Sequence, residues 1–167
     1  IINSINFIYV IDCFAISNGL LFICGYEFFA VEQTTYSNLS TILIASIIPL
    51  YYFNFRKKNK VFLGDSGSLF LGGIISIYVI TVLTNDYIMS PEYDLHKILF
   101  VISILFYPII DIIRIFFLRL IKGKSPFRPD KNHIHHLVLK KINNHFLTTL
   151  IISSISILFL IFTQIIF

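Results

Sequence analysis

The sequence predicts an all-α protein, a polytopic membrane helix bundle of about five transmembrane helices with its active-site loops at one face. Two observations predict this fold class. Of the 167 residues, 56% are hydrophobic and 13% are charged, whereas a soluble domain carries about 25% charged residues. The hydrophobic residues form long runs without strict polar and apolar alternation, and unpaired strand edges are not tolerated in lipid. Helices are therefore the expected membrane-spanning elements.

Five stretches, with their polar ends included, approach the roughly 17–25 residues that a spanning helix needs. The second should bend near Pro49, and the fourth contains Pro108. No internal repeat or low-complexity linker divides the chain, so residues 1–167 are predicted to form a single membrane domain. In chain order, the predicted spans cover residues 13–31, 41–55, 68–83, 97–118 and 146–167.

The distribution of basic residues predicts an orientation. Four of the 13 Lys and Arg residues lie within residues 56–60 and eight within residues 114–141, whereas the loops 32–40 and 85–95 contain none. Basic loops face the cytoplasm. Five alternating spans in the inner (cytoplasmic) membrane then bring three polar segments, distant in sequence, to the cytoplasmic face. The alternative is that the basic loops only bind anionic lipid headgroups and form no active site.

The first polar feature is an acidic residue in a turn of small residues, GDSGSLFLG at residues 64–72. A carboxylate at a bilayer edge is costly to desolvate, which favours a functional role for Asp65. The flanking glycines allow backbone and ligand to approach closely, and Asp65 could then hold a hard cation such as Mg²⁺ against a phosphate. Asp65 is also predicted to be the N-cap of the third span, a role compatible with metal binding.

The second feature is a loop with three histidines, at residues 123–136. Its two prolines predict that a helix begins only after the second of them. On that helix His133 and His136 share a face, and His135 points elsewhere. Imidazoles beside Arg128 suit a diphosphate or a nucleotide. Zinc is the alternative, although no Cys and no His-Glu-x-x-His arrangement completes a ligand set.

The third feature is a polar pair within the fourth span. Asp111 and Arg114 are three residues apart, a spacing that brings two helical side chains together. We expect a structural pair at the wall of the site, and a direct role in catalysis stays open.

Three motifs together resemble the polyprenyl-phosphate N-acetylhexosamine-1-phosphate transferases, glycosyl transferase family 4, membrane enzymes that start cell-envelope polysaccharides such as the lipopolysaccharide O-antigen. They are GDSGSLFLG, PIIDIIR at residues 108–114 and SPFRPDKNHIHH at residues 125–136. The resemblance covers the chain as the C-terminal half of such an enzyme. It implies that an N-acetylhexosamine-1-phosphate passes from a UDP-amino sugar, usually UDP-N-acetylglucosamine, to polyprenyl (undecaprenyl) phosphate, with release of UMP.

The resemblance also implies the partners of the protein. They are the polyprenyl phosphate lipid, the UDP-amino sugar and the membrane, with no nucleic acid. The implied cofactor is Mg²⁺, with Mn²⁺ as an alternative. A homodimer is left open, as is the choice between a one-step transfer and a route through an Asp nucleophile.

Site residues follow from the resemblance position by position. Asp65 matches the metal-binding Asp of the family, with Asn6 as a further metal contact. The family's Asn-x-x-Asn-x-x-Asp-Gly-x-Asp-Gly stretch maps onto Asn3, Asn6 and Asp12, which gives Asp12 a catalytic role. The remaining implied substrate-binding residues are Arg128, His133, His135 and His136.

The chain departs from the family pattern in two respects. Tyr9 and Val10 replace the first Asp-Gly, and Cys13 replaces the second Gly. The family's Asp-Asp pair does not occur in these 167 residues. We therefore expect either a part of a longer transferase or, as the alternative function, a degenerate and non-catalytic membrane paralogue that binds lipid phosphate or nucleotide.

Overall fold

The structure is a computed structural model, and all the regular secondary structure in its described residues is α-helical, as the composition predicts. It describes residues 14–54, 56, 61, 63–84, 87–89, 94–123, 125 and 133–166, with Asp65 and Asp94 described by their backbone alone. In chain order the helices are α2 (Phe14–Phe29), α3 (Ser37–Asn54), α4 (Gly64–Leu83), α5 (Asp94–Ile104), α6 (Phe106–Ile121), α7 (Ile134–Ile142) and α8 (His145–Ile166).

Helix α2 is the centre of the bundle, and it packs against α3, α4, α5 and α8. Its first turn, Phe14 to Ser17, is buried on all sides, whereas Cys24 and Phe28 farther along the helix are exposed. Gly25 allows the close approach of α5, because a Cβ at this position would lie 2.5 Å from Ile104 Cδ1. Next to Gly25, the Tyr26 ring packs against the rings of Tyr78 and Tyr87, with a centroid distance of 4.6 Å in both pairs.

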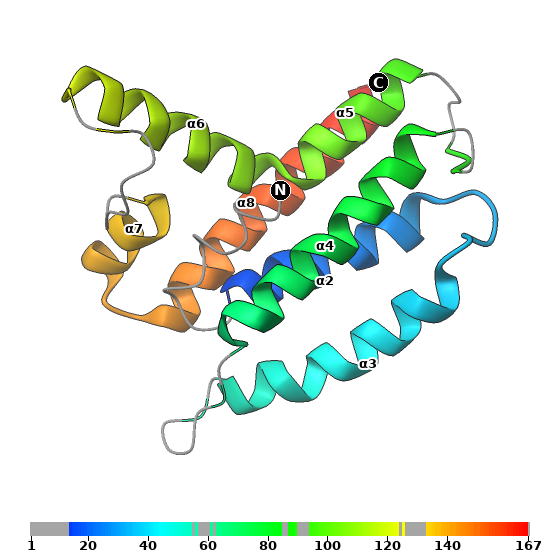
Figure 1. The fold of residues 1–167 in the computed structure, drawn as a ribbon, viewed down its shortest axis with the longest axis horizontal. Coiled ribbons are helices and arrows are strands. Elements are labelled where there is room, and N and C mark those ends of the chain that lie inside the picture. Colours follow the sequence, from blue (N-terminus) through cyan, green and yellow to red (C-terminus); the bar gives the residue numbers. More distant parts are fainter. Residues whose placement is uncertain are drawn as a thin grey trace.

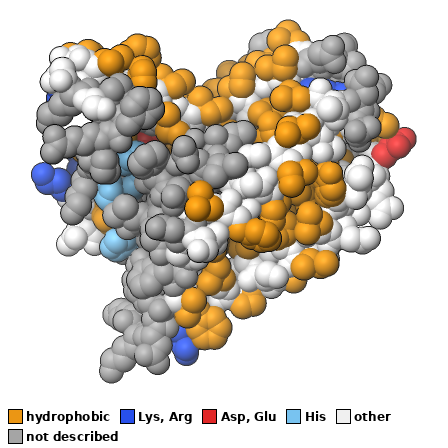
Figure 2. Space-filling model, in the orientation of Figure 1, with side chains coloured by type: hydrophobic (Ala, Val, Ile, Leu, Met, Phe, Trp, Pro, Cys, Tyr) orange, Lys and Arg blue, Asp and Glu red, His pale blue; other side chains and the backbone are white. Residues whose placement is uncertain are grey.

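The helices alternate in direction. Figure 1 shows that α2, α4 and α8 begin at one end of the bundle, the end at which α3 finishes and α7 lies. Figure 2 shows hydrophobic side chains spread over the visible face and histidines gathered at the α7 end. The beginning of α4 and the histidine helix α7 are therefore at one end, as alternating spans predict.

The described residues contain two helices that are long and apolar enough to cross a membrane, α4 over Ser66–Leu83 and α8 over His145–Ile166. The bent pair α5 and α6 would add a third crossing if it counts as one span. Helix α2 is apolar but has 16 residues. All five predicted stretches are thus helical where the structure describes them, and the protein is a membrane protein. Among the described residues, however, fewer than five helices qualify as full spans.

The fourth predicted span, residues 97–118, is not one helix, and this expectation is corrected. Helix α5 ends at Ile104, α6 begins at Phe106, and the two are bent by 74°. Pro108 lacks the backbone N–H that would bond the Ile104 carbonyl, so the helix is interrupted there. The break has a consequence for the site, because α6 leaves the direction of the bundle and extends toward α7 (Figure 1).

Helix α4 begins one turn earlier than predicted. Its first residue is Gly64 and its N-cap is Leu63, which makes no side-chain capping hydrogen bond. Gly64 has φ +71°, a left-handed conformation that glycine adopts without strain and that turns the chain into the helix here. Asp65 therefore lies inside the first turn of α4, and the prediction that it is the N-cap was wrong.

Candidate functional site

Helix α6 has one buried face that carries three polar side chains, those of Tyr107, Asp111 and Arg119. Tyr107, Asp111, Ile115 and Arg119 are all buried and follow one another at four-residue intervals. Sequence reasoning had paired Asp111 only with Arg114, and that ion pair is present, with 3.6 Å between Arg114 Nη2 and Asp111 Oδ1. The stronger contacts of this face are with the start of α7.

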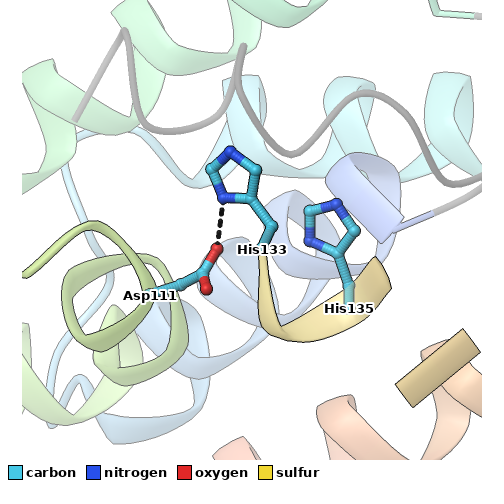
Figure 3. Close-up of side chains that lie close together, drawn as sticks. All are labelled: Asp111, His133 and His135. Atoms are coloured by element: carbon cyan, nitrogen blue, oxygen red, sulfur yellow. Dashed lines mark hydrogen bonds and ion pairs between the residues drawn. The ribbon is translucent and has the colours of Figure 1, made fainter. Parts of the chain in front are cut away.

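Asp111 binds the first residues of α7 through both carboxylate oxygens. His133 Nδ1 donates to Oδ2 at 2.6 Å, and the backbone N–H of Ile134 donates to Oδ1 at 2.8 Å (Figure 3). Asp111 is 1% exposed. A carboxylate at this position also interacts favourably with the positive end of the α7 dipole. A side chain of α6 thus caps α7, in place of the local side-chain cap that His133 does not supply.

Tyr107 makes the corresponding contact with the second histidine. Its hydroxyl lies 2.9 Å from His135 Nδ1, and it accepts the backbone N–H of His135 at 3.3 Å. Tyr107 and Asp111 are separated by one helical turn, so α6 presents two hydrogen-bonding groups in register with two histidines.

The rings of the site pack in one cluster at the beginning of α2. The imidazoles of His133 and His135 are stacked, with centroids 5.2 Å apart and planes 6° apart. Phe14, the first residue of α2, covers the cluster with its ring 4.7 Å from that of Tyr107 and 5.7 Å from that of His135. The start of α2, two residues after Asp12 in the sequence, therefore contacts the histidine motif.

His135 is completely buried. Burial lowers the pKa of His135 to about 3, with smaller contributions from His136 and His133. The imidazole is therefore neutral at physiological pH. Its Nε2 has no hydrogen-bond partner within the protein, which is uncommon for a buried polar atom and leaves it accessible to a water molecule, an ion or a ligand.

The structure brings the three predicted histidines together but arranges them differently from the prediction. His133 is not helical, with φ −58° and ψ 149°, so a three-residue spacing does not place it on the α7 face of His136. The His133 ring stacks on His135 and lies 6.3 Å from that of His136, and the His135 and His136 rings are 4.5 Å apart. The prediction that His135 points elsewhere was wrong, because helical periodicity does not apply to an extended N-cap residue.

The other predicted site residues are not placed by the structure. The Asp65 backbone lies in the first turn of α4, and its side chain is outside the described residues. The predicted positions that lie wholly outside them are Asn3, Asn6, Asp12 and Arg128.

One group of described residues has the spacing of a metal site. Ligand atoms of Asp111, His133 and His135 all lie within 4.8 Å of one another. Two imidazoles and one carboxylate suit Zn²⁺ better than Mg²⁺, which prefers oxygen ligands. However, both oxygens of Asp111 and Nδ1 of His133 already bond to each other or to Ile134. This hydrogen-bonded arrangement favours orientation of the imidazoles over chelation by all three groups.

An apolar groove of about 690 Å³ lies between α2, α3 and α8. Its lining includes Ser17 near the start of α2 and Phe146 and Thr149 near the start of α8. The groove thus reaches the end of the bundle that carries the histidines.

Comparison with known proteins identifies relatives of this chain. Residues 1–83 match glycosyl transferase family 4. The chain is 42% identical over 106 residues to the undecaprenyl-phosphate alpha-N-acetylglucosaminyl 1-phosphate transferase of Pasteurella multocida, which covers 60% of the chain and 28% of that protein. The proteins of the same name from Haemophilus influenzae and Escherichia coli are 39% and 36% identical over 113 and 112 residues, which cover 65% of the chain and 30% and 29% of those proteins.

The matched part of the chain therefore spans less than a third of the length of these curated relatives. No solved structure matches the chain.

Proposed function

We propose that this chain, which belongs to glycosyl transferase family 4 through its residues 1–83, carries part of the active site of a membrane phosphoglycosyltransferase. The proposed reaction transfers N-acetylhexosamine-1-phosphate from a UDP-sugar, UDP-N-acetylglucosamine in the first instance, to undecaprenyl phosphate. The names of the relatives support the acceptor lipid and the transferred group. The product would begin a cell-envelope polysaccharide such as lipopolysaccharide.

The observation that carries this proposal is the pair of stacked imidazoles held by α6 at the start of α2. In Figure 3 the Nδ1 atoms of His133 and His135 face α6, and both Nε2 atoms point to the other side. Two imidazole edges that face one way at the membrane surface suit the oxygens of a diphosphate. The neutral His135 would donate a hydrogen bond without adding charge, and His136 and Arg128 would add further contacts.

The chemistry is proposed as a direct displacement. An oxygen of the lipid phosphate attacks the β-phosphorus of the UDP-sugar. A new P–O bond forms while the bond from that phosphorus to the bridging oxygen breaks, and UMP leaves with the bridging oxygen. Such reactions depend on positioning and charge stabilisation more than on covalent help from the protein. Mg²⁺, or Mn²⁺ in its place, would neutralise diphosphate charge when bound by Asp65 and Asn6 with help from Asp12.

The UDP-sugar and the lipid phosphate would bind to different surfaces of the protein. The nucleotide would meet the histidine cluster and Asn3 from the cytoplasm, since the basic loops predict a cytoplasmic site in the inner membrane. The apolar groove between α2, α3 and α8 offers surface to a hydrocarbon chain at the same end of the bundle.

The test is UMP release by membranes of cells that express the reading frame encoding the chain, with undecaprenyl phosphate, UDP-N-acetylglucosamine and Mg²⁺ added. Asp65→Asn should abolish turnover and leave membrane insertion intact, because loss of one charge beside a metal–diphosphate costs about 3–4 kcal/mol. Glu32→Gln, which removes an exposed carboxylate from the loop between α2 and α3, is the matched control. Near-normal turnover by Asp65→Asn would contradict the metal role. UMP binding without release by the unsubstituted protein would favour the non-catalytic paralogue.

A further inference from the structure

The apolar groove between α2, α3 and α8 has two chemically different ends. Its hydroxyl-bearing residues lie toward the end of the bundle that carries α7, with Ser17 in the first turn of α2 and Thr149 and Ser153 in the first half of α8. Toward the other end the lining is apolar and includes Phe28 of α2 and Ile161 of α8. From Thr149 to Ile161 the groove follows α8 for about 18 Å, more than half of the ~30 Å hydrocarbon core of a bilayer.

Two hydroxyls in the wall of the groove have no partner within the protein. Thr149 is 1% exposed, and neither its Oγ1 nor the Oγ of Ser153 makes a hydrogen bond. The two residues are four apart on α8, so their side chains share the face that lines the groove. Ser156 of the same helix instead bonds the Ile152 carbonyl at 3.1 Å, a common partner for a helical serine. Unpaired buried hydroxyls are destabilising, and a ligand with hydrogen-bond acceptors in the groove would pair them.

The end of the bundle that carries these hydroxyls favours a negative charge. Helix α8 begins there, so the positive end of its dipole lies about one turn from Thr149. Exposed basic side chains are present at the same end, because Arg56 follows the last residue of α3 and Lys140 and Lys141 lie in the last turn of α7. An anionic acceptor such as a phosphate is therefore favoured over a neutral one.

The groove connects the histidine cluster with the surrounding bilayer. The Phe14 ring lies 5.7 Å from that of His135, and Ser17, three residues farther along α2, lines the groove. At the apolar end, Phe28 is 80% exposed and Ile161 is 44% exposed. A hydrocarbon chain can therefore enter the groove sideways from the lipid while its polar end stays near the histidines.

We propose that this groove binds the lipid phosphate acceptor, with Thr149 and Ser153 donating hydrogen bonds to its phosphate and the polyprenyl chain extending along α2 and α8 toward Phe28 and Ile161. A lipid with one anionic end and one long hydrocarbon chain matches a groove that is polar at one end and apolar over the rest. The inference rests on the proposed function for the identity of the lipid. It adds the two binding hydroxyls and the direction of the chain.

The first experiment labels the full chain in detergent micelles with a short-chain polyprenyl phosphate that carries a photoreactive group at the far end of its chain. Peptide mass spectrometry should locate the label on the second halves of α2 and α8, and undecaprenyl phosphate should compete with labelling. Undecaprenol, which has the same chain without the phosphate, should compete about tenfold more weakly because it forms no charged hydrogen bond. Label confined to other helices, or equal competition by the alcohol, would overturn the proposal.

The second experiment removes each hydroxyl with little change of volume. Thr149→Val and Ser153→Ala should each weaken competition by undecaprenyl phosphate about tenfold, since a hydrogen bond to a charged group is lost, and leave competition by undecaprenol unchanged. Ser156→Ala is the matched control, because its hydroxyl bonds the Ile152 carbonyl and does not line the groove. Thr149→Val should not lower the unfolding temperature, because its hydroxyl has no partner to lose. A lower unfolding temperature with unchanged lipid competition would show a structural role and overturn the assignment.

The third experiment separates the lipid site from the proposed function. Leu21→Trp should fill the groove and abolish labelling, whereas Ile80→Trp, on an exposed part of α4, should not. Labelling requires no UDP-sugar, so the two proposals fail separately. Labelling as expected without UMP release would refute the transferase and leave the lipid site intact. UMP release by Leu21→Trp with an unchanged KM for undecaprenyl phosphate would refute the lipid site and leave the transferase intact.

Discussion

Removal of the Asp111 carboxylate should release α7 from α6 without unfolding the bundle. In Asp111→Ala, the buried His133 Nδ1–H and the backbone N–H of Ile134 both lose their acceptor. A hydrogen bond to a charged group contributes about 1.5–3 kcal/mol, so the two together give about 3 kcal/mol at the lower bound. A loss of that size corresponds to about a hundredfold more frequent opening of α7.

Hydrogen exchange, measured by mass spectrometry on the purified protein in detergent, reports how often α7 opens. Amides of α7 should exchange about a hundredfold faster in Asp111→Ala, and amides in the middle of α4 should keep their rates. Asp111→Asn should show a much smaller effect, because it retains an acceptor for Ile134 N–H. Arg114→Ala should also show little effect, since the ion pair at 3.6 Å is partly exposed. Equal α7 exchange in the Ala variant and the unsubstituted protein would refute the reasoning that Asp111 caps α7.

Three further predictions concern the charge, the pH response and the packing of the bundle. A cysteine in place of Lys58 should react with an impermeant thiol reagent only after cells are opened, and labelling of intact cells would contradict the cytoplasmic orientation. Because the pKa of His135 is lowered from 6.5 to about 3, the unfolded chain binds the proton first as pH falls. Stability should be constant above about pH 6.5 and about 2 kcal/mol lower at pH 5. Thermal unfolding should show this decline, and the decline should be smaller in His135→Gln. Gly25→Val should lower the free energy of unfolding by about 1–3 kcal/mol, and with it the unfolding temperature, because the added side chain overpacks against Ile104. Gly73→Ala should not, because its added Cβ has no atom within 4 Å beyond its own helical neighbours. Equal unfolding temperatures for the two variants would contradict this packing.

The amino-acid sequence by itself determined the class of fold and the positions of the helices. Runs of apolar residues can only be helical in lipid, because every backbone polar group must be satisfied within the segment. The five predicted stretches are accordingly helical. The sequence also identified the histidine motif, since three imidazoles within four residues next to basic side chains are recognisable without any tertiary information.

The tertiary structure alone decided how the candidate site is assembled. The break at Leu105 was not visible as a break, because Pro108 is compatible both with a kinked span and with the first turn of a new helix. Yet this break directs α6 toward α7 and pairs Asp111 with His133, which is 22 residues away in sequence. The four-residue spacing of Tyr107 and Asp111 on an apolar helix indicated that the two side chains share a face. A spacing does not identify the residues that such a face contacts.

The same reason explains why the orientation of His133 relative to His135 was predicted wrongly. Helical periodicity predicts which side chains share a face only where the backbone is helical, and His133 is extended because its Nδ1 and the following N–H both bond one carboxylate of another helix. Local sequence rules describe the bonds that a segment makes with itself. The orientation of these imidazoles depends on bonds between segments, which exist only once α6 and α7 have packed together.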